Sequence, residues 1–291
     1  LRDLVTGAHC FPSDPVRPGM LQGKVLRPPS FGAKLRSIDL TKAKAMEGVV
    51  VIRDGDFIGC AAPTTSRAAQ ALSALAETAT WDPAPHPSSK ELFSHLKAHV
   101  RGSAEPGGSV AEALRGAKKM LSATYTTAYI QHAPLEPRAA VAEWNDGKVT
   151  IWTGSQAPFG VRSEVARTLG IPEDRVRVII PDAGGGFGGK HTGEYAVEAA
   201  RMAREAGRPI ALRWTRREEF TWAYYRPAAL IEIQAGLDDK GSLVAWNFIN
   251  INSGGAGVGT PYEVPRARTE SLPSDPPLRQ GSYRTLAATA N

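Results

Sequence analysis

Several residue patterns are scarce or missing in this sequence, and each shortage excludes a class of function. The only cysteines are Cys10 and Cys60, too few for the four-cysteine ligand set of an iron–sulfur cluster or a structural zinc site. No apolar run approaches the roughly 20 residues of a membrane-spanning helix. No run of Lys or Arg exceeds two residues, so the net charge of +6 does not indicate nucleic-acid binding. We expect both thiols to be buried in the core.

The remaining composition is typical of a globular protein of about two domains. The chain has 291 residues, of which 42% are apolar and 22% are charged. Prolines at residues 83–87 and glycines at residues 102–108 interrupt the regular patterns. They predict a first domain over residues 1–86, a linker over residues 87–120 and a second domain over residues 121–291. The cellular compartment is left open.

Alternating strand and helix signals predict an α+β fold. Turn sequences between apolar runs predict three hairpins, over residues 49–61, 141–152 and 229–252. Further strands are expected at residues 20–26, 175–180 and 209–215. Helices are expected at residues 66–80, 88–100 and 161–169 and after residue 190. A capping box of Ser88 and Glu91 is expected to start the second helix, and prolines are expected to hold residues 259–278 in an irregular path.

Two histidines have a spacing that is compatible with metal binding. His95 and His99 lie four residues apart and would share one face of the helix at residues 88–100. The sequence offers no third ligand nearby, so we expect both side chains to be solvated. No residue is assigned as a direct metal ligand.

The most informative stretch runs from Pro181 to Lys190, between a predicted strand and a predicted helix. Five of the six residues Gly184–Gly189 are glycine. Glycine adopts backbone conformations that other residues avoid and lets the main chain approach a ligand closely. A helix that follows such a loop offers N–H groups suited to phosphate oxygens. The stretch is therefore a candidate cofactor-binding loop.

Two nucleotide-binding motifs also match this loop formally. Its glycines at 184, 186 and 189 fit the dinucleotide fingerprint G-x-G-x-x-G, and Gly184–Lys190 fits the phosphate loop G-x-x-x-x-G-K. Neither match is complete. His191 stands where a phosphate loop needs Ser or Thr to hold Mg²⁺, and the next predicted strand does not end in the carboxylate that would bind a ribose. A nucleotide-binding loop and a purely structural turn stay open as alternatives.

Seven short segments together resemble the molybdenum-binding large subunit of the molybdenum hydroxylases, the family of xanthine dehydrogenase, aldehyde oxidoreductase and isoquinoline 1-oxidoreductase. The segments are Asp3–Ala8, Pro18–Pro29, Glu47–Val50, Gln131–Pro137, Thr153–Gln156, Gly184–Lys190 and Ser282–Arg284. The resemblance implies that residues 1–86 form an α/β-hammerhead domain. It also implies that residues 121–291 form the first part of a molybdopterin-binding domain.

The resemblance further implies roles for individual residues. Gln156 resembles the glutamine whose amide hydrogen-bonds an oxygen ligand of molybdenum, and Arg284 resembles an arginine near the substrate pocket. Phe187 and His191 are expected to line that pocket. The loop that offers backbone N–H groups to the metal centre is matched by Gly185, Gly186, Phe187 and Gly188.

Two departures from the family's motifs narrow the implied substrate class. His191 stands where xanthine-oxidising members carry a glutamate that binds the purine. Thr285 stands where the carbon monoxide dehydrogenases of the family carry an active-site cysteine. The resemblance therefore implies an aldehyde or an N-heteroaromatic substrate, oxidised with water as the source of oxygen.

The resemblance also implies components that this sequence does not supply. The cofactor would be molybdenum–molybdopterin in the cytosine dinucleotide form. Electrons would pass to a separate iron–sulfur subunit, because two cysteines cannot bind the clusters. The general-base glutamate would lie beyond Asn291, so we expect a truncated fragment that is inactive alone. A non-catalytic binding or assembly module on the same scaffold is the alternative.

Overall fold

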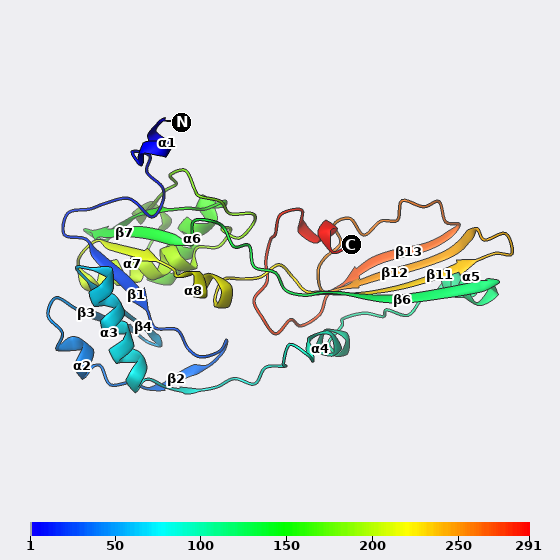
Figure 1. Ribbon diagram of the computed structural model, residues 1–291, viewed down its shortest axis with the longest axis horizontal. Helices are drawn as coiled ribbons and strands as arrows, with labels where there is room; N and C mark the ends of the chain where they lie inside the picture. The colour runs from blue at the N-terminus through cyan, green and yellow to red at the C-terminus, as the bar shows by residue number, and fades with distance from the viewer. Residues whose placement is uncertain (1) are drawn as a thin grey trace. The chain divides into compact units, whose positions relative to one another are not determined.

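The computed structural model describes residues 2–291 and divides them into two compact units (Figure 1). The first unit contains the chain up to Pro85 and the segment Ala133–Ala223. The second contains His86–His132 and Tyr224–Asn291. Each unit is therefore assembled from two segments that are far apart in the sequence. The division at residues 86 and 120 expected from composition remains a prediction.

A seven-stranded mixed sheet forms the centre of the first unit, in the order β3-β4-β1-β10-β7-β8-β9. β1 pairs with β10 and β8 with β9 in parallel, and the other neighbours are antiparallel. One sheet thus joins strands from both segments of the unit. The strands are β1 (Leu21–Val25), β3 (Val50–Asp54), β4 (Phe57–Ala62), β7 (Ala139–Asn145), β8 (Lys148–Thr153), β9 (Val176–Ile179) and β10 (Ile210–Arg213).

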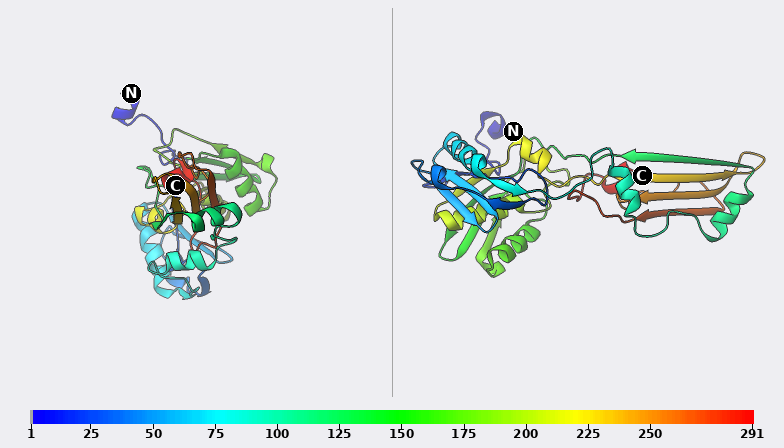
Figure 2. Two further views of the ribbon diagram at one scale, coloured as in Figure 1. Left: turned by 90° about the vertical axis from the view of Figure 1, so that its right-hand side faces the viewer. Right: turned by 90° about the horizontal axis from the view of Figure 1, so that it is seen from below.

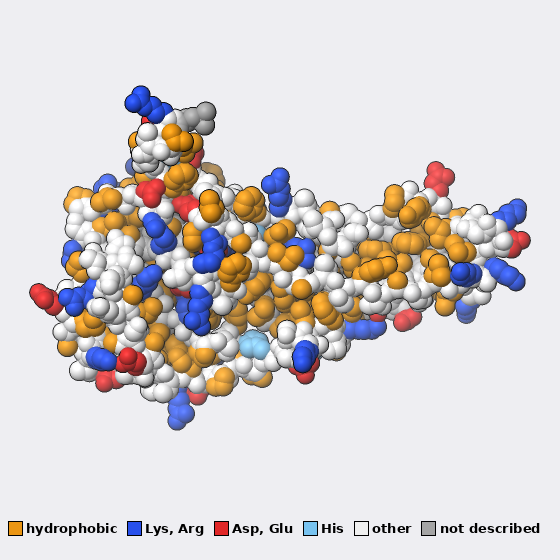
Figure 3. All heavy atoms as spheres, viewed as in Figure 1, with side chains coloured by type: hydrophobic (Ala, Val, Ile, Leu, Met, Phe, Trp, Pro, Cys, Tyr) orange, Lys and Arg blue, Asp and Glu red, His pale blue; other side chains and the backbone are white. Residues whose placement is uncertain are grey.

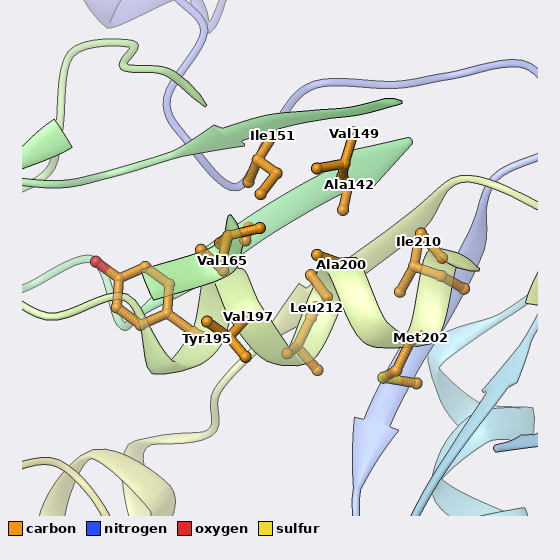
Figure 4. Packing of buried hydrophobic residues seen from close by; sticks show 14 of the residues in the cluster. Ala142, Val149, Ile151, Val165, Tyr195, Val197, Ala200, Met202, Ile210 and Leu212 are labelled. Carbon is orange, nitrogen blue, oxygen red and sulfur yellow. The ribbon is translucent and has the colours of Figure 1, made fainter. Parts of the chain in front are cut away.

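Helices cover both faces of this sheet. α7 (Glu194–Ala206) and α6 (Pro158–Leu169) pack on one face, where Tyr195, Val197 and Met202 meet the side chains of the strands (Figure 4). α3 (Thr65–Thr78) packs on the other face over β4 and β1. Shorter elements complete the unit: α1 (Arg2–Thr6), α2 (Thr41–Lys44), η1 (Glu173–Arg175), α8 (Arg216–Thr221) and the two-stranded sheet of β2 (Lys34–Ser37) and β5 (Thr80–Asp82).

The second unit contains a four-stranded sheet in the order β13-β12-β11-β6 (Figure 2). Its strands are β6 (Lys119–Thr127), β11 (Ala229–Leu237), β12 (Leu243–Ile251) and β13 (Arg266–Leu272), and its helices are α4 (Leu92–Ala98), α5 (Gly108–Gly116) and the short η2 (Leu286–Thr289). Hydrophobic side chains gather over this sheet on the face shown in Figure 3. Leu121 and Tyr125 of the edge strand β6 are exposed.

Most of the expected elements are confirmed. The three hairpins form as β3–β4, β7–β8 and β11–β12. The helix after the glycine-rich loop buries Tyr195, Ala199 and Met202 on its apolar stripe, as its periodicity predicts. Glycines in the left-handed conformation end both α6 and α7, at Gly170 and Gly207. Within residues 2–291, no helix has the length and apolar character needed to cross a membrane.

Three local expectations were wrong. Glu91 accepts the backbone N–H of Ser88, which is one half of the expected capping box, but Ser88 Oγ donates to Glu91 Oε2 instead of accepting an N–H, and α4 begins only at Leu92 without a side-chain cap. The region 259–278 is not irregular throughout, because it contains β13, which pairs in parallel with β12. The strand can form because Pro265 and Pro273 lie outside it and leave its interior N–H groups free to pair. Cys10 is exposed, whereas Cys60 is buried as expected.

Candidate functional site

The glycine-rich loop connects β9 to α7 in the first unit and has an unusual backbone. Gly185 and Gly188 have φ of +98° and +88°, values that glycine adopts without steric cost. Phe187 also has a positive φ, of 55°, although it carries a side chain. That conformation costs on the order of 1–2 kcal/mol. Phe187 is 44% exposed, so burial of this residue does not explain the strain. Strain of this kind is often found at functional sites.

Gln156 lies between β8 and α6 and forms hydrogen bonds to the glycine-rich loop. Its side-chain Oε1 accepts hydrogen bonds from the backbone N–H groups of Gly188 (3.0 Å) and Lys190 (3.3 Å). Its own backbone N–H donates to the carbonyl of Lys190 at 2.8 Å. Because both side-chain partners are donors, the atom that faces them must be the carbonyl oxygen. The NH₂ end of this exposed side chain is therefore directed away from those two donors.

Two of the glycines leave no room for a side chain. A Cβ added at Gly186 would lie 2.6 Å from Oε1 of Gln156. A Cβ added at Gly184 would lie 2.5 Å from Cβ of Glu136. At these positions glycine is needed because the loop lies directly against Gln156 and Glu136, not because φ is unusual.

Three consecutive backbone donors of the loop are open to a ligand. The N–H groups of Gly188 and Gly189 bind Gln156 and the carbonyl of Gly186, respectively. Within the described chain, the N–H groups of Gly185, Gly186 and Phe187 have no acceptor. Gly186 lies against the Gln156 side chain, so the loop and the glutamine together present several donors. Such a set suits a ligand that is rich in oxygen acceptors.

A buried ion pair anchors the first half of the loop. Lys190 Nζ lies 3.2 Å from Glu136 Oε2, and the same oxygen accepts the N–H of Gly184 at 2.9 Å. Burial lowers the pKa of Lys190, and the attraction of Glu136 opposes that shift. Glu136 therefore contacts both Gly184 at the start of the glycine run and Lys190 directly after it.

A second buried ion pair, missed by sequence reasoning, supports the other end of the loop. Arg138 Nη1 lies 2.5 Å from Glu219 Oε2, and both side chains are almost fully buried. Arg138 Nη2 donates to the carbonyl of Gly189. Arg138 and Glu219 are 81 residues apart and belong to no motif, so only the fold brings them together. Their one sequence signal is that Arg138 directly follows the segment Gln131–Pro137.

The phosphate-loop alternative does not fit this geometry. In a phosphate loop the lysine reaches the phosphates, but Lys190 is buried against Glu136. The helix does not begin until Glu194, and the N–H of Gly193 in front of it already donates to Glu164 at 2.8 Å. The first N–H group in front of α7 is therefore already occupied by a carboxylate, and phosphate binding at the start of this helix remains a prediction.

The remaining candidate residues are placed differently. His191 is exposed and follows the loop directly. Arg284 is exposed and belongs to the second unit, whereas Gln156 belongs to the first, and the role of Arg284 remains a prediction. The neighbouring Tyr283 ring packs against His132, with 5.1 Å between ring centroids. Across residues 2–291, no three His, Cys, Asp or Glu side chains cluster in a way that could hold a metal ion.

Comparisons with known proteins identify the family. Residues 93–272 match the model of the molybdopterin cofactor-binding domain. The chain is 28% identical to a nicotinate dehydrogenase subunit of Pseudomonas putida over 256 residues, which are 84% of this chain and 21% of that protein. It is 37% identical over 134 residues to the aldehyde oxidoreductase molybdenum-binding subunit PaoC of Escherichia coli, covering 46% of this chain and 18% of that protein.

A comparison with solved structures finds a similar fold. Quinoline 2-oxidoreductase from Pseudomonas putida 86 superimposes with a TM-score of 0.79 at 22% sequence identity, over 97% of this chain and 44% of that chain. This chain therefore spans less than half of each of these three proteins. The matched residues 93–272 include Gln156 and the whole glycine-rich loop. The chain belongs to the molybdopterin cofactor-binding domain family of the molybdenum hydroxylases.

Proposed function

We propose that Gln156 and the loop Gly185–Gly188 form one wall of a molybdopterin site in a molybdenum hydroxylase that oxidises an aldehyde or an N-heteroaromatic substrate. The observation that carries the proposal is the orientation of Gln156. Its oxygen is bound by two loop N–H groups, so its NH₂ group can donate to an oxygen ligand of the metal.

The residues present fit such a cofactor. Three open N–H groups, of Gly185, Gly186 and Phe187, match a group that is rich in oxygen, nitrogen and sulfur acceptors. The absence of side chains at Gly184 and Gly186 lets the loop lie close to Gln156 and Glu136. When bound, the cofactor supplies the two-electron oxidation chemistry, with water as the oxygen source. The chain's own contribution is to fix donors in advance, so that little reorganisation is needed on binding.

The rest of the proposal concerns parts outside this wall. Phe187 and His191 would line the substrate pocket, and Arg284 would stabilise negative charge on the substrate. Residues 1–86 would form the hammerhead domain, residues 87–120 a linker and residues 121–291 the first part of the cofactor-binding domain. No residue of this chain is proposed as the general base.

We also propose the cytosine dinucleotide form of the cofactor and a separate iron–sulfur partner. Two of the relatives are described as subunits, one of them as a molybdenum-binding subunit. The two cysteines of this chain are too few for an iron–sulfur cluster, so electron transfer requires another protein.

Metal and pterin analysis of Gln156 variants tests the proposal. The protein that contains this chain is expressed with its iron–sulfur partner and purified, and molybdenum and pterin are measured per chain. Gln156→Ala is expected to lower cofactor occupancy or to slow turnover of an aldehyde at full occupancy, by roughly tenfold or more for one lost donor. Gln70→Ala, on the exposed face of α3, is the matched control and is expected to change neither.

Three outcomes would count against the proposal. Absence of both molybdenum and pterin from the purified wild-type protein would refute the cofactor assignment and favour a non-catalytic module. Equal occupancy and equal turnover in the Gln156→Ala and Gln70→Ala variants would refute the role of Gln156. Release of no cytidine monophosphate on mild hydrolysis of the extracted cofactor would refute the dinucleotide form.

A further inference from the structure

We propose that a cavity in the first unit, between β1, β10 and the start of α3, binds a phosphate monoester. The cavity measures about 470 Å³, and its lining includes Lys24 and Arg213 but no carboxylate. Neither Gln156 nor any residue of the glycine-rich loop lines it. It is therefore separate from the proposed cofactor wall, although both lie in the same compact unit.

Strand alternation places the two cations on one face of the sheet. A Cβ added at Gly23 would lie 3.0 Å from the methyl of Met202 in α7, so Gly23 faces that helix. Its neighbours Gln22 and Lys24 must face the opposite side. On β10, Ile210 and Leu212 are buried with α7, which places Arg213 on the same side as Lys24. On this side of the sheet, α3 packs over β4 and β1. The cavity lies at the N-terminal end of α3.

Neither cation has a counter-ion among the residues that the structure describes. No ion pair within residues 2–291 involves Lys24 or Arg213, and Arg213 donates only to the carbonyl of Ser13, at 3.0 Å. Lys24 is half-buried and lies opposite Cys60 in the β1–β4 register. Burial raises the pKa of that thiol to about 12, so Cys60 stays neutral and does not balance the lysine.

The carboxylate of Glu218, which contacts the lining residue Thr215, is already paired. Glu218 caps α8 by accepting the N–H of Thr215 at 2.8 Å, and Arg27 lies 2.9 Å from its other oxygen. Lys24 is half-buried and Arg213 is exposed, and two cations without counter-ions on the lining of one cavity produce a positive potential that favours an anion. A phosphate monoester dianion matches the two charges, whereas a single carboxylate would match only one.

The start of α3 supplies neutral donors beside the cations. The Thr64 side chain caps the helix by accepting the N–H of Arg67 at 3.2 Å. The N–H groups of Thr65 and Ser66 have no acceptor within the described chain. Both Thr64 and Thr65 line the cavity, and the helix that follows is 14 residues long. Open N–H groups and a helix N-terminus stabilise phosphate oxygens, and charged donors strengthen that binding.

Titration with inorganic phosphate tests this inference. Calorimetry at constant ionic strength is expected to show saturable binding to the wild-type chain, with weaker binding of chloride. Lys24→Gln and Arg213→Gln are each expected to weaken binding about tenfold or more, as the loss of a charged hydrogen bond predicts. Lys34→Gln and Arg36→Gln, at exposed positions of β2, are matched controls and should bind as the wild type does.

A second measurement keeps the test decisive if a cavity variant does not fold. In the wild-type chain, phosphate is expected to shift the amide NMR signals of Thr65 and Ser66. The inference is overturned if binding does not saturate, if these amides do not respond, or if folded Lys24→Gln and Arg213→Gln variants bind as the controls do. Gln156→Ala should retain full phosphate affinity, so this result is independent of the cofactor proposal.

Discussion

Replacing Gly186 with alanine tests how the glycine-rich loop holds Gln156. The new Cβ would lie 2.6 Å from Oε1 and 3.0 Å from Cδ of Gln156. The Gly186 backbone itself can accept alanine, because its φ lies outside the left-handed region. The amide at the end of the glutamine side chain must therefore move, and Gly188 and Lys190 lose their acceptor.

The size of the effect follows from those two hydrogen bonds. Each is expected to contribute about 0.5–1.5 kcal/mol, so Gly186→Ala should lower the free energy of unfolding by roughly 1–3 kcal/mol. Urea denaturation measures the change directly. Gly160→Ala is the matched control, because its Cβ would meet only Ala157 at 3.8 Å inside α6. That control should stabilise the chain by about 0.5–1 kcal/mol.

A double-mutant cycle separates this mechanism from general damage to the loop. In a Gln156→Ala background the glutamine amide that the new methyl group would displace is already absent. Adding Gly186→Ala should therefore hardly change the free energy of unfolding of that variant. An equal cost in both backgrounds, or a Gly186→Ala variant as stable as the wild type, would refute the reasoning.

Three further predictions concern buried groups and can be tested by denaturation. Arg138→Met leaves the buried Glu219 without its charged partner and should lower the free energy of unfolding by about 3–5 kcal/mol. An unchanged free energy of unfolding would contradict the ion pair. Gly184→Ala should lower the free energy of unfolding more than Gly186→Ala does, because Cβ of Glu136 is attached to the backbone and cannot rotate away from the new methyl group. The reverse order would contradict this packing. Burial raises the pKa of Cys60 from 9.0 to about 12, so folding retains its proton while the unfolded chain loses it. Its contribution is therefore present below pH 9 and is lost as pH rises toward 12, by about 1.4 kcal/mol per unit. A Cys60→Ala variant should not show this fall in the free energy of unfolding above pH 9. The same pH dependence in the variant and the wild type would contradict the raised pKa of Cys60.

Much of the candidate site could be predicted from the sequence. The glycine run, its position after a strand and the segment containing Gln156 are local features, and the structure does bring Gln156 against Gly186 and Gly188. The buried pair of Arg138 and Glu219 could not be predicted, because neither residue has a periodic pattern or motif that indicates a partner 81 residues away. The role of Lys190 was also open, since its textual match to a phosphate loop gave no sign of the contact with Glu136.

The sequence by itself determined the hairpins at Asp54-Gly55 and Asp146-Gly147, the apolar stripe of α7 and the ends of α6 and α7. Turn chemistry, side-chain periodicity and capping depend on residues within about ten positions of one another, so they can be read along the chain. Only the tertiary structure decided that β1 pairs with β10, that β13 joins β12 and that Lys24 and Arg213 share a face. Those outcomes depend on which apolar faces are buried together, and burial is a property of the whole packed unit.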